Sequence, residues 1–232
     1  MPPHVTIHQR FVGPPGMGNG GYVAGAVAAF IEGPARIKLA RPTPLDRPLP
    51  IVRTPSGGAL LQDQGETLVE GEPTQLTLSV PAPPDFATAR RLMADSVALQ
   101  RPVHPICFVC SAQRGENDGL RIHPGRVDDT MMVAAAWTPD ASLADASGLI
   151  DPIFLWSALD CPGAYAFMID RKPGFLGTLS GSIEGEIRPG EECVVIGWQI
   201  GSSGRKLLAG SAIFNAANQL CGRAEAIWIE AG

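Results

Sequence analysis

The stretch Gly18–Phe30, GNGGYVAGAVAAF, predicts a helix whose first turn is unusually rich in glycine. Glycine inside a helix is less favourable than alanine by roughly 0.5–1 kcal/mol, so glycines on both sides of Asn19 need a reason. One reason is capping, because Asn is a favoured N-cap residue. The other is chemical, because uncovered backbone N–H groups at a helix N-terminus can bind a negative charge or a developing oxyanion. Both interpretations stay open for Asn19, and they are compatible.

The composition is that of a globular protein. Of the 232 residues, 45% are hydrophobic and 18% are charged, which excludes a disordered chain. The formal net charge is −5 and the basic residues form no cluster, so we expect no nucleic-acid partner. No apolar run reaches the length of a membrane span, and Met1–Arg10 lacks the apolar core of a signal peptide. We therefore expect a cytoplasmic protein with no membrane partner.

The cysteines are expected to be reduced, because their number is odd and the expected compartment is the cytoplasm. Cys107 and Cys110 have the C-x-x-C spacing found in metal sites. Zinc would need two further ligands, and the nearest candidates, His104 and His123, fit no standard spacing. We therefore favour two cysteines packed in a turn, and we predict no metal and no cofactor.

The chain reads as two halves with the same order of elements. In the first half, a strand is expected within 5–12, then the helix, then four strands within 35–40, 49–53, 58–70 and 74–80. In the second half, strands are expected at 119–123 and 130–137, a helix over 151–169, and strands at 177–187, 192–200, 206–216 and 220–229. Proline-rich segments on either side of a possible helix at 85–100 separate the halves. This internal repeat predicts an N-terminal unit at 1–81, a linker at 82–105 and a C-terminal unit at 106–232.

Three segments carry a family resemblance. NGGYVAGAVAAF resembles the His/Asn-Gly-Gly helix opening of hotdog-fold acyl-CoA thioesterases. CFVCSAQRGENDGLRI (107–122) and DPIFLWSALDCPGAYAF (151–167) are similar to two motifs of the PaaI-like branch of that family. The resemblance implies an α+β tandem, or double, hotdog with two central helices, each wrapped by a curved antiparallel sheet. The chain departs from the family pattern at Asn19, often His, at Ser111, usually Gly, and at Cys161, usually Glu.

The resemblance also implies a site made from both central helices. Backbone N–H groups at the start of one helix would polarise a thioester carbonyl, and a carboxylate from the other would act as base or nucleophile. Aligning Asn19 with Asp151 pairs Ala28 with Asp160, since both lie nine residues further on (28 − 19 = 160 − 151 = 9). The first helix thus keeps the glycines and the second keeps the acid. We predict one composite site per chain, with Gly20 and Gly21 as the oxyanion hole and Asp160 as base or nucleophile.

Further residues have predicted roles around this site. Asn19, Tyr22 and Trp156 are candidates for substrate contact, although the two aromatic residues also suit a core. Asp151 followed by Pro152 is interpreted as an ordinary helix start, so the counterpart site should be inactive. For Asp160, the alternative is a buried, hydrogen-bonded aspartate near a helix break, because Pro162 disfavours helical geometry just before it.

The predicted function is hydrolysis of an acyl-CoA-like thioester, a small-molecule substrate. The alternative is a non-catalytic acyl-CoA or acyl-chain binding protein on the same fold. A hydratase or dehydratase is disfavoured, because no histidine lies on either predicted central helix. By analogy with other hotdog proteins, whole chains are expected to pair into a homodimer.

Overall fold

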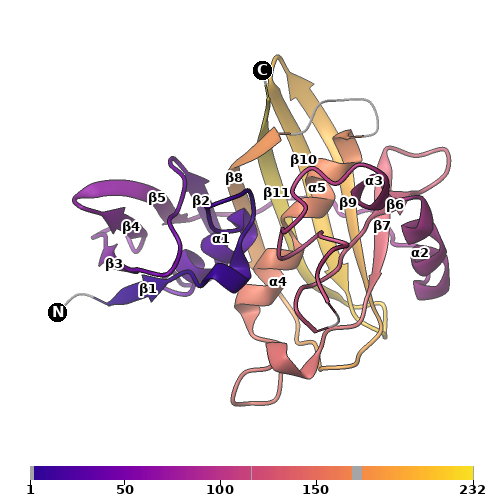
Figure 1. The fold of residues 1–232 in the computed structure, drawn as a ribbon, viewed down its shortest axis with the longest axis horizontal. Helices are drawn as coiled ribbons and strands as arrows, with labels where there is room; N and C mark the ends of the chain where they lie inside the picture. Colours follow the sequence, from indigo (N-terminus) through magenta and orange to yellow (C-terminus); the bar gives the residue numbers. More distant parts are fainter. Residues whose placement is uncertain (1–2, 116, 169–173, 232) are drawn as a thin grey trace.

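The computed structural model describes residues 3–115, 117–168 and 174–231. Within them, eleven strands form one antiparallel sheet in the order β1-β3-β4-β5-β2-β8-β11-β10-β9-β7-β6 (Figure 1). The strands are β1 (His4–Thr6), β2 (Ala35–Leu39), β3 (Pro48–Arg53), β4 (Ala59–Asp63), β5 (Glu66–Pro73), β6 (Gly125–Arg126), β7 (Met132–Trp137), β8 (Gly174–Ile183), β9 (Cys193–Ser203), β10 (Lys206–Phe214) and β11 (Leu220–Glu230). Among the described residues, no helix has the length and apolar character needed to cross a bilayer.

The two halves of the chain repeat one topology. The first half is ordered β1-β3-β4-β5-β2 and the second β7-β9-β10-β11-β8, with β6 added at its edge. β2 ends the row of the first half and β8 ends the row of the second half, and these two strands pair to join the halves. β2 and β8 pair antiparallel, with Ala35 opposite Gly181 and Lys38 opposite Thr178. The predicted double hotdog, with its two sheets joined edge to edge, is confirmed.

The central helices lie side by side against this sheet (Figure 1). α1 (Gly20–Ala28) contacts β2, β4 and β5 of the first half, while α4 (Pro152–Ala158) contacts β8 and α5 (Cys161–Phe167) contacts β7, β9 and β10. All residues of α1 after Gly20 are buried, as its almost wholly apolar sequence requires. α1 and α4 also contact each other directly, so the cores of the two halves are continuous.

Two glycines set the distance between α1 and α4. A β-carbon on Gly21 would lie 2.6 Å from the Asp160 β-carbon and 2.7 Å from the Trp156 carbonyl oxygen. A β-carbon on Gly25, one turn later, would lie 2.8 Å from the Trp156 β-carbon. These distances are shorter than any unstrained carbon contact, so the helices could not pack this closely with side chains at either position.

The segment between the halves crosses the outer face of the second sheet. It contains α2 (Phe86–Leu92) and α3 (Val97–Gln100), and α2 contacts β7 and β9. Leu78 and Ala89 pack there in a second, smaller apolar cluster with strand residues such as Ile196. The strand expected at 74–80 is therefore wrong: its alternating apolar residues pack on a sheet face and do not pair in a ladder. The unit boundaries at 81 and 106 stay a prediction.

Other expected elements differ in detail. The predicted strand at 58–70 is a hairpin of β4 and β5, and β1 shares only Val5 and Thr6 with the strand expected within 5–12. Residues 119–123 form no strand, although the N–H groups of Leu120 and Ile122 donate to carbonyls of the 107–110 turn. The helix expected over 151–169 breaks into α4 and α5 at Leu159 and Asp160, and its last residue lies outside the described residues.

Candidate active site

Asp160 lies at the break between α4 and α5 and faces the N-terminus of α1. The break falls one residue earlier than expected, because Pro162 sits in the first turn of α5, where its missing N–H removes no helical hydrogen bond. The Asp160 side chain is buried, and its Oδ2 atom accepts hydrogen bonds from Asn19 Nδ2 at 2.8 Å and from the Gly21 N–H at 2.9 Å. Its Oδ1 atom has no partner among the described residues. One carboxylate oxygen is therefore held by α1, and the other is buried with no partner among the described residues.

Burial changes the acidity of this carboxyl. Loss of water raises the pKa of Asp160 to about 7, and the nearby Cys107 adds to the rise, whereas the hydrogen bonds from Gly21 and Asn19 oppose it. A carboxyl group with a pKa near neutrality can both accept and return a proton.

Asn19 has the capping role that its sequence context suggested, whereas its contact with substrate stays a prediction. Its Oδ1 atom accepts the Tyr22 N–H at 2.9 Å, which makes it the N-cap of α1. Its amide nitrogen points the other way, to Asp160, and Asn19 also lines a cavity. One side chain therefore starts the helix and positions the carboxylate.

A cavity of about 370 Å³ opens in front of these groups. Asn19, Gly20 and Asp160 line it, together with residues of the loop before α1, the segment after β2, and strands β8 and β11. Leu39, Leu176, Phe175 and Trp228 make much of this wall apolar.

The two glycines of the expected oxyanion hole have different surroundings. Gly20 lines the cavity, and no acceptor for its N–H is found within the described residues. The Gly21 N–H already donates to Asp160, and Gly21 is absent from the cavity wall. The structure therefore leaves Gly20 as the available N–H donor, and it uses Gly21 to hold the carboxylate and to let the helices approach.

Tyr22 and Trp156, the other residues expected to contact substrate, do not line this cavity in the described part of the chain. Tyr22 stacks on Phe11 with ring centroids 3.9 Å apart, and Phe108 and Phe154 complete an aromatic cluster around them. Burial, with Asp151 nearby, raises the pKa of Tyr22 to about 12. Trp156, on α4, packs against Gly25 of α1 and against Gly181 of β8. Both residues belong to the core.

The counterpart position on the second helix is an ordinary cap, as predicted. The Asp151 side chain accepts the Ile153 N–H at 2.9 Å, and Pro152 is the first residue of α4. Ala28, the counterpart of Asp160 in the repeat, offers no acid. The complementary placement of glycines and carboxylate on different helices is thus present in the folded chain.

Sequence reasoning did not assign His104, Cys107 or Cys161 to this site, although all three line the cavity. The Cys107 Sγ atom lies 3.9 Å from Asn19 Nδ2 and 3.9 Å from the Cys161 Sγ atom. Hydrogen bonds, first from Cys110 and Cys161, hold the pKa of the Cys107 thiol well below its usual range. The available signals were the C-x-x-C spacing of Cys107 and Cys110 and the presence of Cys161 where the family pattern usually has Glu. No local sequence pattern showed that Cys161 lies beside the other two cysteines.

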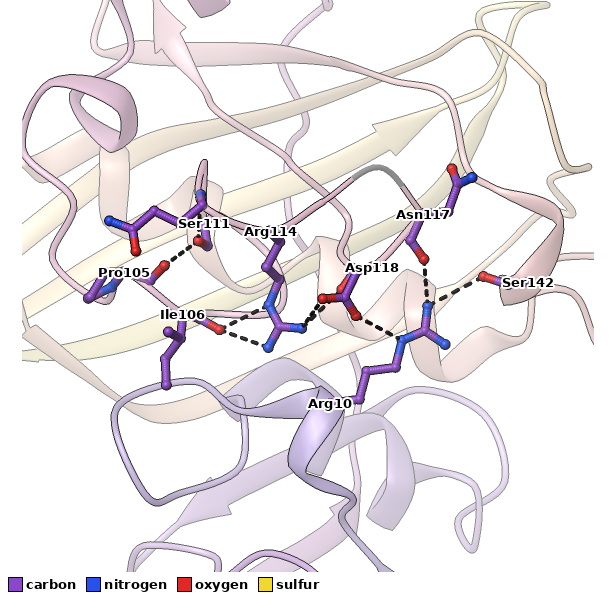
Figure 2. Close-up of polar contacts among 9 residues, drawn as sticks. Arg10, Pro105, Ile106, Ser111, Arg114, Asn117, Asp118 and Ser142 are labelled. Atoms are coloured by element: carbon purple, nitrogen blue, oxygen red, sulfur yellow. Dashed lines mark hydrogen bonds and ion pairs between the residues drawn. The ribbon is translucent and has the colours of Figure 1, made fainter.

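A polar network holds the turn that carries Cys107 and Cys110 (Figure 2). The Arg114 guanidinium donates to the Ile106 carbonyl at 2.8 and 3.0 Å and to the Asp118 carbonyl at 3.0 Å. Arg10, from the first half, donates to the Asn117 carbonyl at 2.9 Å and lies 3.6 Å from the Asp118 carboxylate. The turn is therefore tied both to itself and to the segment that leads into α1.

Comparison with solved structures finds the same fold over almost the whole chain. A putative thioesterase II from Thermobifida fusca YX has a TM-score of 0.64 at 14% identity, covering 99% of this chain and 92% of that one. A putative thioesterase from Novosphingobium aromaticivorans DSM 12444 has a TM-score of 0.63 at 14% identity, covering 99% and 95%. The tesB protein of Mycobacterium avium subs paratuberculosis has a TM-score of 0.63 at 12% identity, covering 95% and 90%.

These likenesses show a hotdog fold, and at such low identity they show the fold alone. No family model matches the sequence, and no curated protein matches it.

Proposed function

We propose that this protein hydrolyses an acyl-CoA-like thioester at the single site around Asp160. One observation carries the proposal: a buried carboxylate, with one oxygen held by α1 and the other unpaired within the described residues, lines an apolar cavity beside the Gly20 N–H. This arrangement combines a base or nucleophile with a donor for a developing oxyanion, which are the two groups that acyl transfer requires.

The chemistry follows from the placement of the two groups. The thioester carbonyl oxygen would lie against the Gly20 N–H, which stabilises the negative charge formed when the carbonyl carbon is attacked. Asp160 Oδ1 either takes a proton from the attacking water or attacks the carbon itself. In the first route the proton passes on to the leaving thiolate; in the second, water hydrolyses the acyl–aspartyl anhydride. Both routes need the same free oxygen.

The cavity wall suits the acyl part of such a substrate. Leu39, Leu176, Phe175 and Trp228 offer apolar surface close to Asp160. Similar proteins named as thioesterases share the fold across both halves, which supports the choice of reaction without identifying the acyl group.

A non-catalytic acyl-CoA binding protein is the second candidate, and one observation favours it. The Gly21 N–H is occupied by Asp160, so only one of the two expected backbone donors is free to polarise a carbonyl. Such a protein would retain the cavity and bind substrate without turnover.

A panel of acyl-CoAs of different chain length, followed with a thiol-detecting reagent, separates the two candidates. We expect thiol release by the natural chain and its loss in Asp160→Asn, with Asp151→Ser as the matched control that changes the cap of the other helix. Tight binding of acyl-CoA with no thiol release from any member of the panel would favour the binding protein.

A further inference from the structure

Three cysteine thiols meet at the inner wall of the cavity. Cys107 and Cys110 belong to the 107–110 turn, ahead of the first strand of the second half, and Cys161 is the first residue of α5. Their sulfur atoms all lie within 4.8 Å of one another, and those of Cys107 and Cys161 are 3.9 Å apart. All three side chains are buried. The proposed hydrolysis uses none of them.

Against the sequence-based expectation of no metal, we propose that Cys107, Cys110 and Cys161 bind one thiophilic divalent cation, with Zn²⁺ as the best match. A tetrahedral zinc site has Zn–S bonds of about 2.3 Å, which places its sulfurs about 3.8 Å apart. The distance of 3.9 Å between Cys107 and Cys161 already matches this value. No other sulfur pair is more than 4.8 Å apart, so small side-chain rotations would complete the geometry.

Metal binds thiols in their deprotonated form. The hydrogen bond with Cys107, together with burial, raises the pKa of the Cys110 and Cys161 thiols, so a metal would displace their protons on binding. Asn19 Nδ2 lies 3.9 Å from the Cys107 sulfur and donates to it. Donors around a metal–thiolate group offset its negative charge and orient its ligands.

The protein supplies three ligands, and the fourth position adjoins the cavity. Cys107 and Cys161 line the cavity, whereas Cys110 is not part of its wall. A bound ion would complete its coordination from the cavity, with water or with the sulfur of a thiol. The network around Arg114 and Arg10 fixes the Cys107–Cys110 turn before any metal arrives (Figure 2), so little ordering is needed on binding.

The chain contains its own control for this site. Cys193 in β9 is also buried and unpaired with another cysteine, but it is outside the three-sulfur cluster. Cys193→Ala therefore removes a buried thiol without touching a proposed ligand.

The test uses reduced, chelator-treated protein and Co²⁺ as a spectroscopic probe, followed by Zn²⁺ competition against a chromophoric chelator. We expect one equivalent per chain, with sulfur-to-cobalt charge-transfer absorption that Zn²⁺ removes. Cys110→Ser and Cys161→Ser should lower the affinity at least about 100-fold, beyond the usual effect of losing an outer-shell partner. Cys193→Ala should bind Co²⁺ and Zn²⁺ with the same affinity as the natural chain.

A second measurement separates loss of binding from loss of fold. Zn²⁺ should raise the melting temperature of the natural chain and of Cys193→Ala, because a ligand that binds only the folded state stabilises that state. The melting temperature of Cys161→Ser should not change when Zn²⁺ is added. Absence of charge-transfer absorption in the reduced natural chain overturns the proposal, as does an equal loss of affinity in Cys193→Ala. The readout is binding, so it is independent of any esterase activity.

Discussion

The Oδ2 atom of Asp160 lies 2.9 Å from the backbone nitrogen of Gly21, a residue 139 positions earlier in the chain. This single hydrogen bond joins the acid of the second half to the glycine-rich helix start of the first half. It also occupies the Gly21 N–H, so of the two glycines expected to form the oxyanion hole only Gly20 has an N–H without an acceptor among the described residues.

Asp160→Asn should keep the fold and remove turnover. The asparagine oxygen can still accept from Asn19 and Gly21, but the side chain can neither take a proton nor attack a thioester. Loss of a general base lowers kcat by about 10²–10⁴-fold, and loss of a nucleophile has at least a comparable effect. Steady-state kinetics and thermal melting measure both quantities. An unchanged kcat at an unchanged melting temperature would make Asp160 a structural residue.

Asn19→Ser should separate the two roles of this side chain. Serine is also a good N-cap, so α1 should still start correctly. The amide donor to Asp160 is lost, and hydrogen bonds to a charged group contribute about 1.5–3 kcal/mol, so we expect lower stability and lower kcat together.

Asp151→Ser is the matched control for that substitution, because it changes the cap of the other helix in the same way. It should leave the melting temperature and the rate nearly unchanged. A rate loss as large as that of Asp160→Asn would show that the active and inactive positions have been exchanged.

Gly21→Ala should destabilise the protein. Its β-carbon would lie 2.9 Å or less from rigid atoms of the α4 segment, including backbone, and overpacking of this kind typically raises the free energy of the folded state by about 1–3 kcal/mol. Chemical denaturation measures the change.

Gly20→Ala is the matched control for Gly21→Ala, because it adds the same methyl group one residue earlier. Its β-carbon would meet mainly the end of the flexible Leu176 side chain at 2.9 Å, which can move. We expect near-normal stability and a higher KM, because Leu176 lines the cavity. Equal destabilisation by the two substitutions would contradict the assignment of Gly21 to helix packing.

Each chain should bind one substrate molecule. A non-hydrolysable acyl-CoA analogue should saturate at one equivalent in calorimetry, because Asp151 caps its own helix and Ala28 supplies no acid. Ala28→Asp should not add a second site, since Pro152 offers no N–H at the facing helix start and the Asp151 carboxylate would repel an oxyanion. Two equivalents from the natural chain would show that both positions bind.

Much of the fold could be predicted because it depends on local patterns. Alternating apolar residues marked most strands of the second half, and Asn19 and Asp151 marked the starts of both central helices. Alternation also predicted a strand at residues 74–80, and that prediction was wrong, because the alternating apolar side chains there pack on a sheet face. Alternation reports which side chains are buried, and it does not distinguish a sheet ladder from a surface that covers one.

The sequence by itself determined the repeat, the cap residues and the unusual position of one aspartate in an apolar helix. Only the tertiary structure decided which groups meet: it gave the Gly21 N–H to Asp160, placed Tyr22 and Trp156 in the core, and brought Cys161 to Cys107 and Cys110. The physical reason is distance along the chain. Helix and strand patterns arise from neighbours within a few residues. A site between two halves depends instead on how closely the central helices of the two halves pack. Gly21 and Gly25 permit this close packing, and no local sequence pattern reveals it.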